Sequence, residues 1–114
     1  MLTIYGIPNC DTIKKTLHAL KERQIPFVFH DYKKNGIGME QLEKWLQQTP
    51  LDTLINRAGT TFKKLSDDDK NALANRASAL SILMDKPSII KRPIIEKEGQ
   101  IVMIGWKPEV LDTL

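Results

Sequence analysis

The chain of 114 residues contains a single cysteine, Cys10, and this scarcity excludes several classes of protein. One thiol cannot form an intramolecular disulfide, a four-cysteine metal site or a CxxC dithiol, whose second cysteine would stand where Ile13 does. The chain also has no run of roughly 18 consecutive apolar residues, which a membrane helix needs. Its start has no basic region followed by an apolar run, so we expect no signal peptide. With no disulfide framework, we expect a cytoplasmic protein.

Charge of one sign is also scarce, because the net charge is only +3. Such a balance can attract an anionic small molecule, but it does not indicate a nucleic-acid partner. The apolar fraction of 41% and the charged fraction of 27% are typical of a globular protein. The length predicts one domain over residues 1–114, and no stretch reads as a linker between two cores.

The first third of the chain has the pattern of a βαβ unit. Leu2–Tyr5 reads as a strand, and Asn9 suits the start of a helix over Asp11–Arg23 that has one apolar face. Phe27–Phe29 is apolar on successive residues, which predicts a strand covered on both faces. The crossover should be right-handed and the two strands parallel.

The middle of the chain predicts a helical insertion at about residues 39–86, after a polar loop over Asp31–Gly38. The expected helices are Met39–Leu46, a short one at Leu51–Ile55, one that starts at Ser66 and continues through Ala77, and an apolar turn at Leu80–Met84. The acidic run Asp67–Asp69 follows Ser66. A capping serine and acids at the positive end of the helix dipole explain this run better than a metal site does.

The last part of the chain predicts a hairpin and a short helix. Ile94–Lys97 and Ile101–Ile104 read as strands joined at Glu98-Gly99, and Pro108 suits the first turn of a helix. The order βαβ…ββα predicts an α/β fold with a four-stranded mixed sheet and a helical insertion.

Cys10 is the first candidate for chemistry, because it stands where the first strand turns into the first helix. Unpaired backbone N–H groups and the positive end of the dipole favour a thiolate at such a position. Asp11 acts against the thiolate, whereas Lys14, one turn later, acts in its favour. The alternative is a buried structural cysteine, which the polar sequence Pro8-Asn9-Cys10-Asp11 disfavours.

The other candidates are histidines and cations. His18 lies two helical turns from Cys10, about 12 Å away, which is too far for a direct base, and nothing in the sequence places His30 near the thiol. Arg57, Arg92 and Lys107 can bind oxyanions, although any one of them can equally be a solvated surface charge. Taken alone, the residues indicate a cysteine-based site with oxyanion ligands.

Three ordered motifs resemble a known family. They are Ile7–Lys15, Asn56-Arg57 with Phe62–Leu65, and Lys91–Ile95. Together they resemble the glutaredoxin-type arsenate reductase (ArsC) family, most of all its YffB branch, which is related to the Spx transcription regulators.

This resemblance implies a thioredoxin-like fold in which Cys10 is the nucleophile and Pro93 is a cis proline facing it. It implies glutathione as a co-substrate, glutaredoxin as a partner, no metal and no permanently bound cofactor. Arg57 and Arg92 match two of the three arginines that hold arsenate in the family, and the third position is Lys107, which keeps the charge but loses the planar fork. The residues after Cys10 also depart from the arsenate reductase pattern. The implied binding set is Asn9, Lys14, Arg57, Arg92, Pro93 and Lys107.

The family also contains a second class of function. The Spx branch acts by binding the RNA polymerase alpha subunit rather than nucleic acid directly, and it often uses a CxxC switch, which Ile13 excludes here. The enzyme hypothesis is therefore a glutathione-dependent thiol oxidoreductase with a single cysteine, acting on a disulfide or an oxyanion. The alternative is a regulator that docks on the polymerase, and neither hypothesis involves a membrane.

Overall fold

A computed structural model of the protein describes residues 1–114, which divide into two compact units. The first unit combines Met1–Asn35 with Arg92–Leu114, and the second is Gly36–Lys91. No helix in the chain is both long enough and apolar enough to cross a bilayer.

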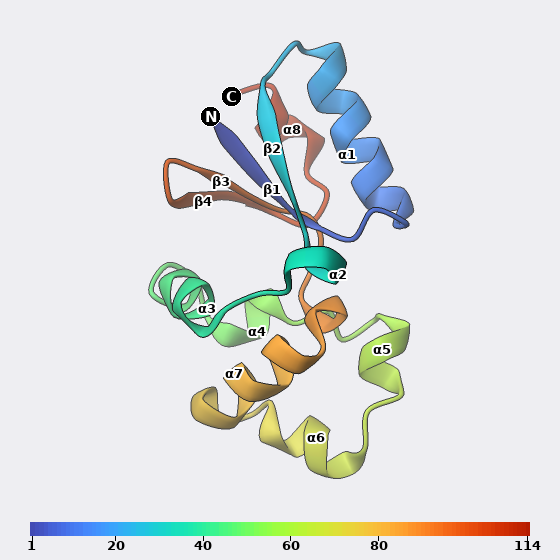
Figure 1. Ribbon diagram of the computed structural model, residues 1–114, viewed down its shortest axis with the longest axis vertical. Helices are drawn as coiled ribbons and strands as arrows, with labels where there is room; N and C mark the ends of the chain where they lie inside the picture. The colour runs from blue at the N-terminus through green and yellow to red at the C-terminus, as the bar shows by residue number, and fades with distance from the viewer. The chain divides into compact units, whose positions relative to one another are not determined.

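The first unit is built on a four-stranded sheet (Figure 1). The strands are β1 (Leu2–Gly6), β2 (Phe27–Asp31), β3 (Ile94–Lys97) and β4 (Gln100–Ile104), in the order β2-β1-β3-β4. β1 pairs with β2 in parallel and with β3 in antiparallel, and β3 pairs with β4 in antiparallel. The predicted α/β fold with a mixed sheet is therefore confirmed.

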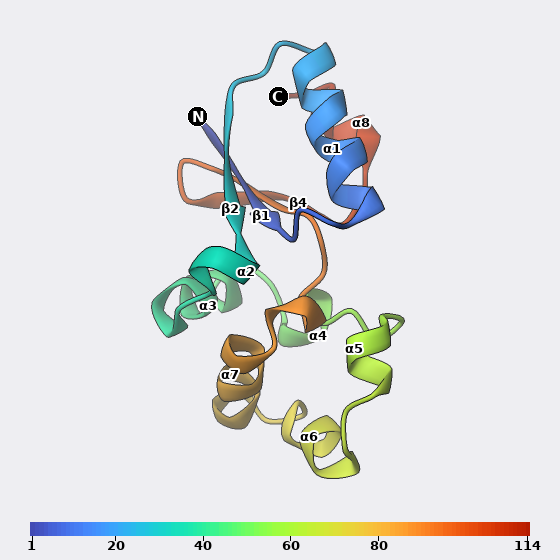
Figure 2. The same cartoon turned by 45° about the vertical axis from the view of Figure 1, so that its right-hand side comes forward.

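One face of this sheet carries the core of the first unit. Helices α1 (Asp11–Glu22) and α8 (Pro108–Leu111) contribute Leu20 and Leu111, which join Leu2, Ile4 and Met103 of the strands in one buried cluster. Figures 1 and 2 show both helices on the same side of the strands. The cluster forms because side chains alternate along each strand and recur every three to four residues along each helix.

Strand β2 differs from its prediction. Phe27 and Phe29 pack against the core cluster, but Val28 is 52% exposed. The expectation that both faces of this strand are covered was wrong, because α1 covers one face only and Val28 points to the other.

The second unit contains only helices besides one isolated β-bridge. They are α3 (Met39–Leu46), α4 (Leu51–Leu54), α5 (Thr60–Lys63), α6 (Asp67–Ala72), α7 (Arg76–Asp85) and the 3-10 helix η1 (Pro87–Ile89). An isolated bridge joins Ile55 to Ile90, and the Lys91 N–H donates to the Leu54 carbonyl at 2.7 Å. The C-terminal end of the unit is therefore tied to the residues at the end of α4.

The predicted helix that starts at Ser66 is capped as expected but is shorter than expected. The Ser66 cap is confirmed, since its hydroxyl accepts a hydrogen bond from the Asp69 N–H at 3.1 Å. The continuous helix from Ser66 through Ala77 was wrong, because Asn75 caps a new helix by accepting from the Ala77 N–H at 2.9 Å.

The predicted polar loop Asp31–Gly38 also contains a short helix, α2 (Tyr32–Asn35). The Asp31 carboxylate accepts a hydrogen bond from the Lys33 N–H at 2.8 Å, which satisfies one of the free donors at the start of that helix.

Gly6, the last residue of β1, sets the approach of α1 to the sheet. It is buried, and a Cβ atom there would meet the side chain of Ile13, which is itself fully buried. The absence of a side chain at Gly6 therefore allows the helix that begins after Cys10 to lie close to the strand.

We expect Gly6→Ala to lower the free energy of unfolding by about 1–3 kcal/mol, because the added methyl group overpacks the contact with Ile13. Denaturant unfolding of the purified variants measures the change. Gly38→Ala is the matched control, since no atom lies within 4 Å of a Cβ there and its φ is −90°. Ile13→Val removes the terminal methyl group, so the double variant should lose less stability than the sum of the two single changes. Additive losses would contradict the contact.

Candidate functional site

Cys10 is the N-cap residue of α1 and is half-buried. Its backbone is extended (φ −114°, ψ 128°), and its carbonyl accepts the first helical hydrogen bond, from the Lys14 N–H at 3.0 Å. Asn9, the residue that suited the helix start, instead lies exposed in the preceding turn. The thiol therefore occupies the cap position itself, where the unpaired N–H groups of the first turn point.

The pKa of the Cys10 thiol is set by opposing contributions and is lowered overall. Burial raises this pKa, but the backbone N–H groups of Ile13 and Thr12 lower it by stabilising the thiolate. The positive charge of Arg92 and a hydrogen bond from its guanidinium lower it further. The helix start and Arg92 together thus outweigh the effect of burial.

Arg92 reaches Cys10 because of the strand register. In the antiparallel pairing of β1 with β3, Tyr5 lies opposite Ile94, so the residues before Ile94 run alongside those that follow Tyr5. The Arg92–Pro93 peptide bond is cis, as the family resemblance implied, and Pro93 is buried. The structure thus brings together two candidates from opposite ends of the sequence.

The other cationic candidates are divided between the two units. Lys14 and Lys107 are exposed in the first unit, Lys14 one turn after Cys10 and Lys107 just before α8. Arg57 belongs to the second unit. Its guanidinium pairs with the Asp52 carboxylate at 2.7 Å, and the guanidinium carbon lies 5.4 Å from the centre of the Phe62 ring. The assignment of Arg57, Lys14, Lys107 and Asn9 to a site with Cys10 stays a prediction.

Neither histidine forms a pair with the thiol. His18 is exposed and contacts Glu22 at 3.0 Å, and the His30 ring lies 4.9 Å from that of Tyr5. The thiolate is therefore stabilised by backbone donors and an arginine rather than by an imidazole.

The sequence did not predict a buried polar cluster that lies on the face of the sheet opposite the core of the first unit. The Tyr5 hydroxyl donates to the Glu96 carboxylate at 2.7 Å, and the rings of His30 and Tyr32 pack beside Tyr5. Burial, followed by the Glu96 hydrogen bond, raises the pKa of Tyr5, and burial raises that of Tyr32. The Arg92 charge acts in the opposite direction on Tyr32, so its field reaches this cluster as well as Cys10. The one signal in the sequence was a carboxylate, Glu96, inside an apolar strand.

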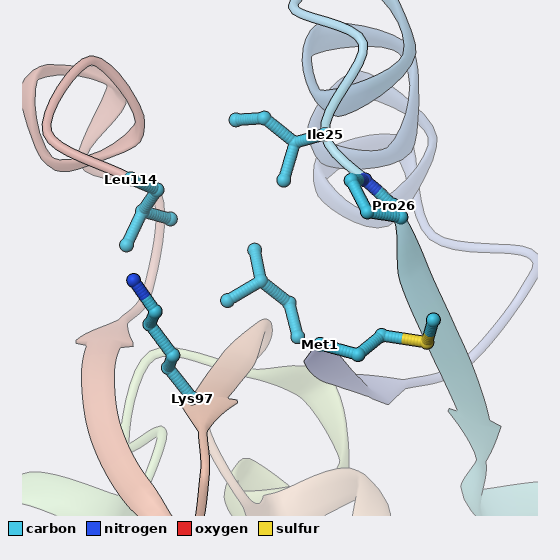
Figure 3. Close-up of a pocket in the computed structure, with 6 residues that line it drawn as sticks. Met1, Ile25, Pro26, Lys97 and Leu114 are labelled. Atoms are coloured by element: carbon cyan, nitrogen blue, oxygen red, sulfur yellow. The ribbon is translucent and has the colours of Figure 1, made fainter.

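A separate cavity of about 170 Å³ lies at the other end of β1 (Figure 3). Met1, Leu2, Ile25, Pro26, Lys97 and Leu114 line it. Its lining contains no thiol, hydroxyl or carboxylate side chain, and it adjoins the start of β1, whereas Cys10 follows the end of that strand. The cavity is therefore not part of the thiol site.

Comparison with known proteins relates this arrangement to a family. The ArsC family model matches residues 5–114. The solved structure of the YffB protein superposes with a TM-score of 0.91 at 40% identity, covering 99% of this chain and 97% of that one. An arsenate reductase (ArsC) related protein from Brucella melitensis superposes with a TM-score of 0.77 at 44% identity, covering 98% and 92%.

Regulators are also among the relatives. The regulatory protein MgsR of Bacillus subtilis is 31% identical over 109 residues, which cover 94% of this chain and 84% of MgsR. The global transcriptional regulator Spx of Staphylococcus saprophyticus is 27% identical over 112 residues, covering 96% and 82%. The implied resemblance to ArsC, YffB and Spx proteins and to their fold is thereby confirmed.

Arg92→Gln should raise the pKa of the Cys10 thiol, because the variant loses the positive charge beside the sulfur. In the native protein the Cys10 thiolate persists at pH values below the ordinary thiol pKa, and it is lost as the pH falls through its own lowered pKa. In the variant this loss begins at a higher pH. We expect about two- to fivefold less thiolate at neutral pH, the worth of a partly exposed ion pair. The ultraviolet absorbance of the thiolate, followed against pH, reports this directly because the chain has one cysteine.

Arg76→Gln removes the same charge from the second unit and is the control. The assigned contact between Arg92 and Cys10 would be contradicted if both variants shift the midpoint of the thiol titration equally, or if neither variant shifts it.

Proposed function

The chain belongs to the ArsC family, and from that premise we propose that it is a thiol oxidoreductase that uses Cys10 as its only nucleophile and glutathione as its co-substrate. The observation that carries this proposal is the position of Cys10 at the N-cap of α1, where the strand register brings Arg92 to it. The helix start and Arg92 lower the pKa of the thiol. The thiolate is the reactive form in thiol–disulfide exchange.

The proposed cycle has two exchanges. The Cys10 thiolate attacks one sulfur of a substrate disulfide, the S–S bond breaks, and the departing sulfur leaves as a thiolate. A glutathione thiolate then attacks the mixed disulfide and restores Cys10. When the substrate is a glutathione mixed disulfide and Cys10 attacks its glutathione sulfur, the other sulfur leaves as a reduced thiolate. The incoming glutathione is oxidised in its place and leaves, joined to the glutathione taken from the substrate, as glutathione disulfide. An external thiol is required because the chain has no second cysteine.

The binding set follows from charge. Glutathione carries two carboxylates, and we propose that Arg92, Lys107, Lys14 and Arg57 bind these groups or an oxyanion substrate, with backbone contacts from Asn9 and Pro93. For Arg57 this requires an exchange of its present partner, the Asp52 carboxylate. The proposed reaction suits the cytoplasm, a reducing compartment in which glutathione keeps thiols reduced.

Incubation of the protein with glutathione disulfide should attach one glutathione through a disulfide to Cys10, because the thiolate displaces a glutathione thiolate. Intact mass spectrometry measures the adduct, which reduced glutathione should then remove. Cys10→Ser is the control and should give no adduct. If the thiol titrates near the ordinary value of about 8.5 and no adduct forms, the catalytic proposal is wrong.

Arsenate reduction with glutathione and glutaredoxin should be weak or absent. Lys107 stands at the position that we match to the third arginine of the family pattern. A lysine lacks the paired donors that hold an oxyanion bidentately. A coupled assay of arsenate-dependent glutathione oxidation measures this activity. Lys107→Arg supplies the paired donors and should raise the rate of arsenate reduction if these donors are the limiting feature. Robust turnover of arsenate by the unmodified protein would refute the inference that Lys107 weakens this activity.

A second candidate function rests on the regulators among the relatives, which are 27–31% identical to this chain. In that case the protein is a non-enzymatic module that binds the RNA polymerase alpha subunit. The two candidates differ in their need for the thiol. Capture of the alpha subunit that survives Cys10→Ser would favour the regulator.

A further inference from the structure

We propose that Lys15, held over the ring of Trp106, is a specificity-determining residue that binds a carboxylate of the disulfide or thiol reacting at Cys10. This inference rests on the proposed function and deepens it. It adds a residue outside the family's cationic set and defines the substrate class as anionic. Both residues lie in the first unit, as do Cys10 and Arg92.

Lys15 belongs to the start of the helix that carries the thiol. It is five residues after Cys10, a rise of about 7.5 Å along the helix axis. Side chains of a helix lean toward its N-terminus, and the Lys15 side chain extends to the Trp106 ring. The residue is exposed, which leaves its ammonium accessible to a ligand.

Trp106 follows a residue that the backbone ties to Pro93. The Gly105 N–H donates to the Pro93 carbonyl at 2.8 Å, so the segment that follows β4 lies against the residue that follows Arg92. Trp106 packs on the core cluster of the first unit, and its ring centre lies 5.0 Å from the Lys15 Nζ. Cys10 is thus linked to Lys15 along α1, and also through Arg92, Pro93 and the Gly105-Trp106 segment.

The pair has the properties of a carboxylate subsite. The ring restrains the ammonium without using its N–H donors, because a cation–π contact is made with the ring face. No carboxylate of the protein lies within ion-pair distance of Lys15. A carboxylate that approaches the thiol can therefore accept hydrogen bonds from an amine that is already held in place, which reduces the entropy lost on binding.

The test compares exchange of Cys10 with two disulfides, glutathione disulfide, which is anionic, and 2-hydroxyethyl disulfide, which is neutral. The readout is the ratio of the two second-order rate constants, from which any change in the thiolate fraction cancels. We expect Lys15→Gln to lower this ratio roughly two- to fivefold, the range for one exposed ion pair, and added salt to reduce the difference. Trp106→Phe keeps an aromatic face and should preserve the ratio.

Lys21→Gln is the matched control, since it removes the same charge from an exposed position in the last turn of α1. A ratio that is unchanged in Lys15→Gln, or lowered equally in Lys21→Gln, would overturn the subsite while leaving the proposed function intact. Failure of the unmodified protein to exchange with either disulfide would overturn the proposed function and the subsite with it.

Discussion

The first unit depends on the pairing of strand β1 on both of its edges. β2 lies along one edge in parallel and β3 along the other in antiparallel, so β1 is the one strand from which both halves of the unit are positioned. Its end releases the turn that carries Cys10, and the antiparallel register brings the start of β3, with Arg92, to the same point. The close approach of α1 at Gly6 then fixes the direction of the helix whose first N–H groups face the sulfur. Loss of this pairing would separate the thiol from its arginine.

The chemistry of the thiol follows from a balance rather than from one strong partner. Burial opposes the thiolate, while two backbone donors and Arg92 favour it, and the favourable contributions prevail. Each favourable contribution to the pKa is modest for a partly exposed group, but the Ile13 and Thr12 donors are held by the backbone of α1 before a substrate arrives. The thiolate of this site is stabilised without a histidine.

The family shows how one fold serves different tasks. Its members include arsenate reductase related proteins and transcriptional regulators of similar length, so the fold alone does not decide the activity. In this chain Lys107 is exposed just before α8, and Lys15 lies against the Trp106 ring. We expect these charged groups, with Arg92 next to the thiol, to decide which substrates the fold accepts.

The sequence by itself determined the order of elements, the mixed sheet, the Ser66 cap and the placement of Cys10 at a helix start. Each of these depends on residues close together in the chain, where periodicity and capping chemistry act. Two predictions from the sequence were wrong. The helix from Ser66 does not continue through Ala77, because the Asn75 side chain caps a new helix. Both faces of β2 are not covered, because the exposure of Val28 depends on which face the helices cover. Only the tertiary structure decided that Arg92 bonds to the thiol, that Tyr5 meets Glu96 and that Lys15 lies over Trp106. Those contacts join residues about eighty to ninety positions apart, and strand register and core packing, which no local pattern encodes, bring them together.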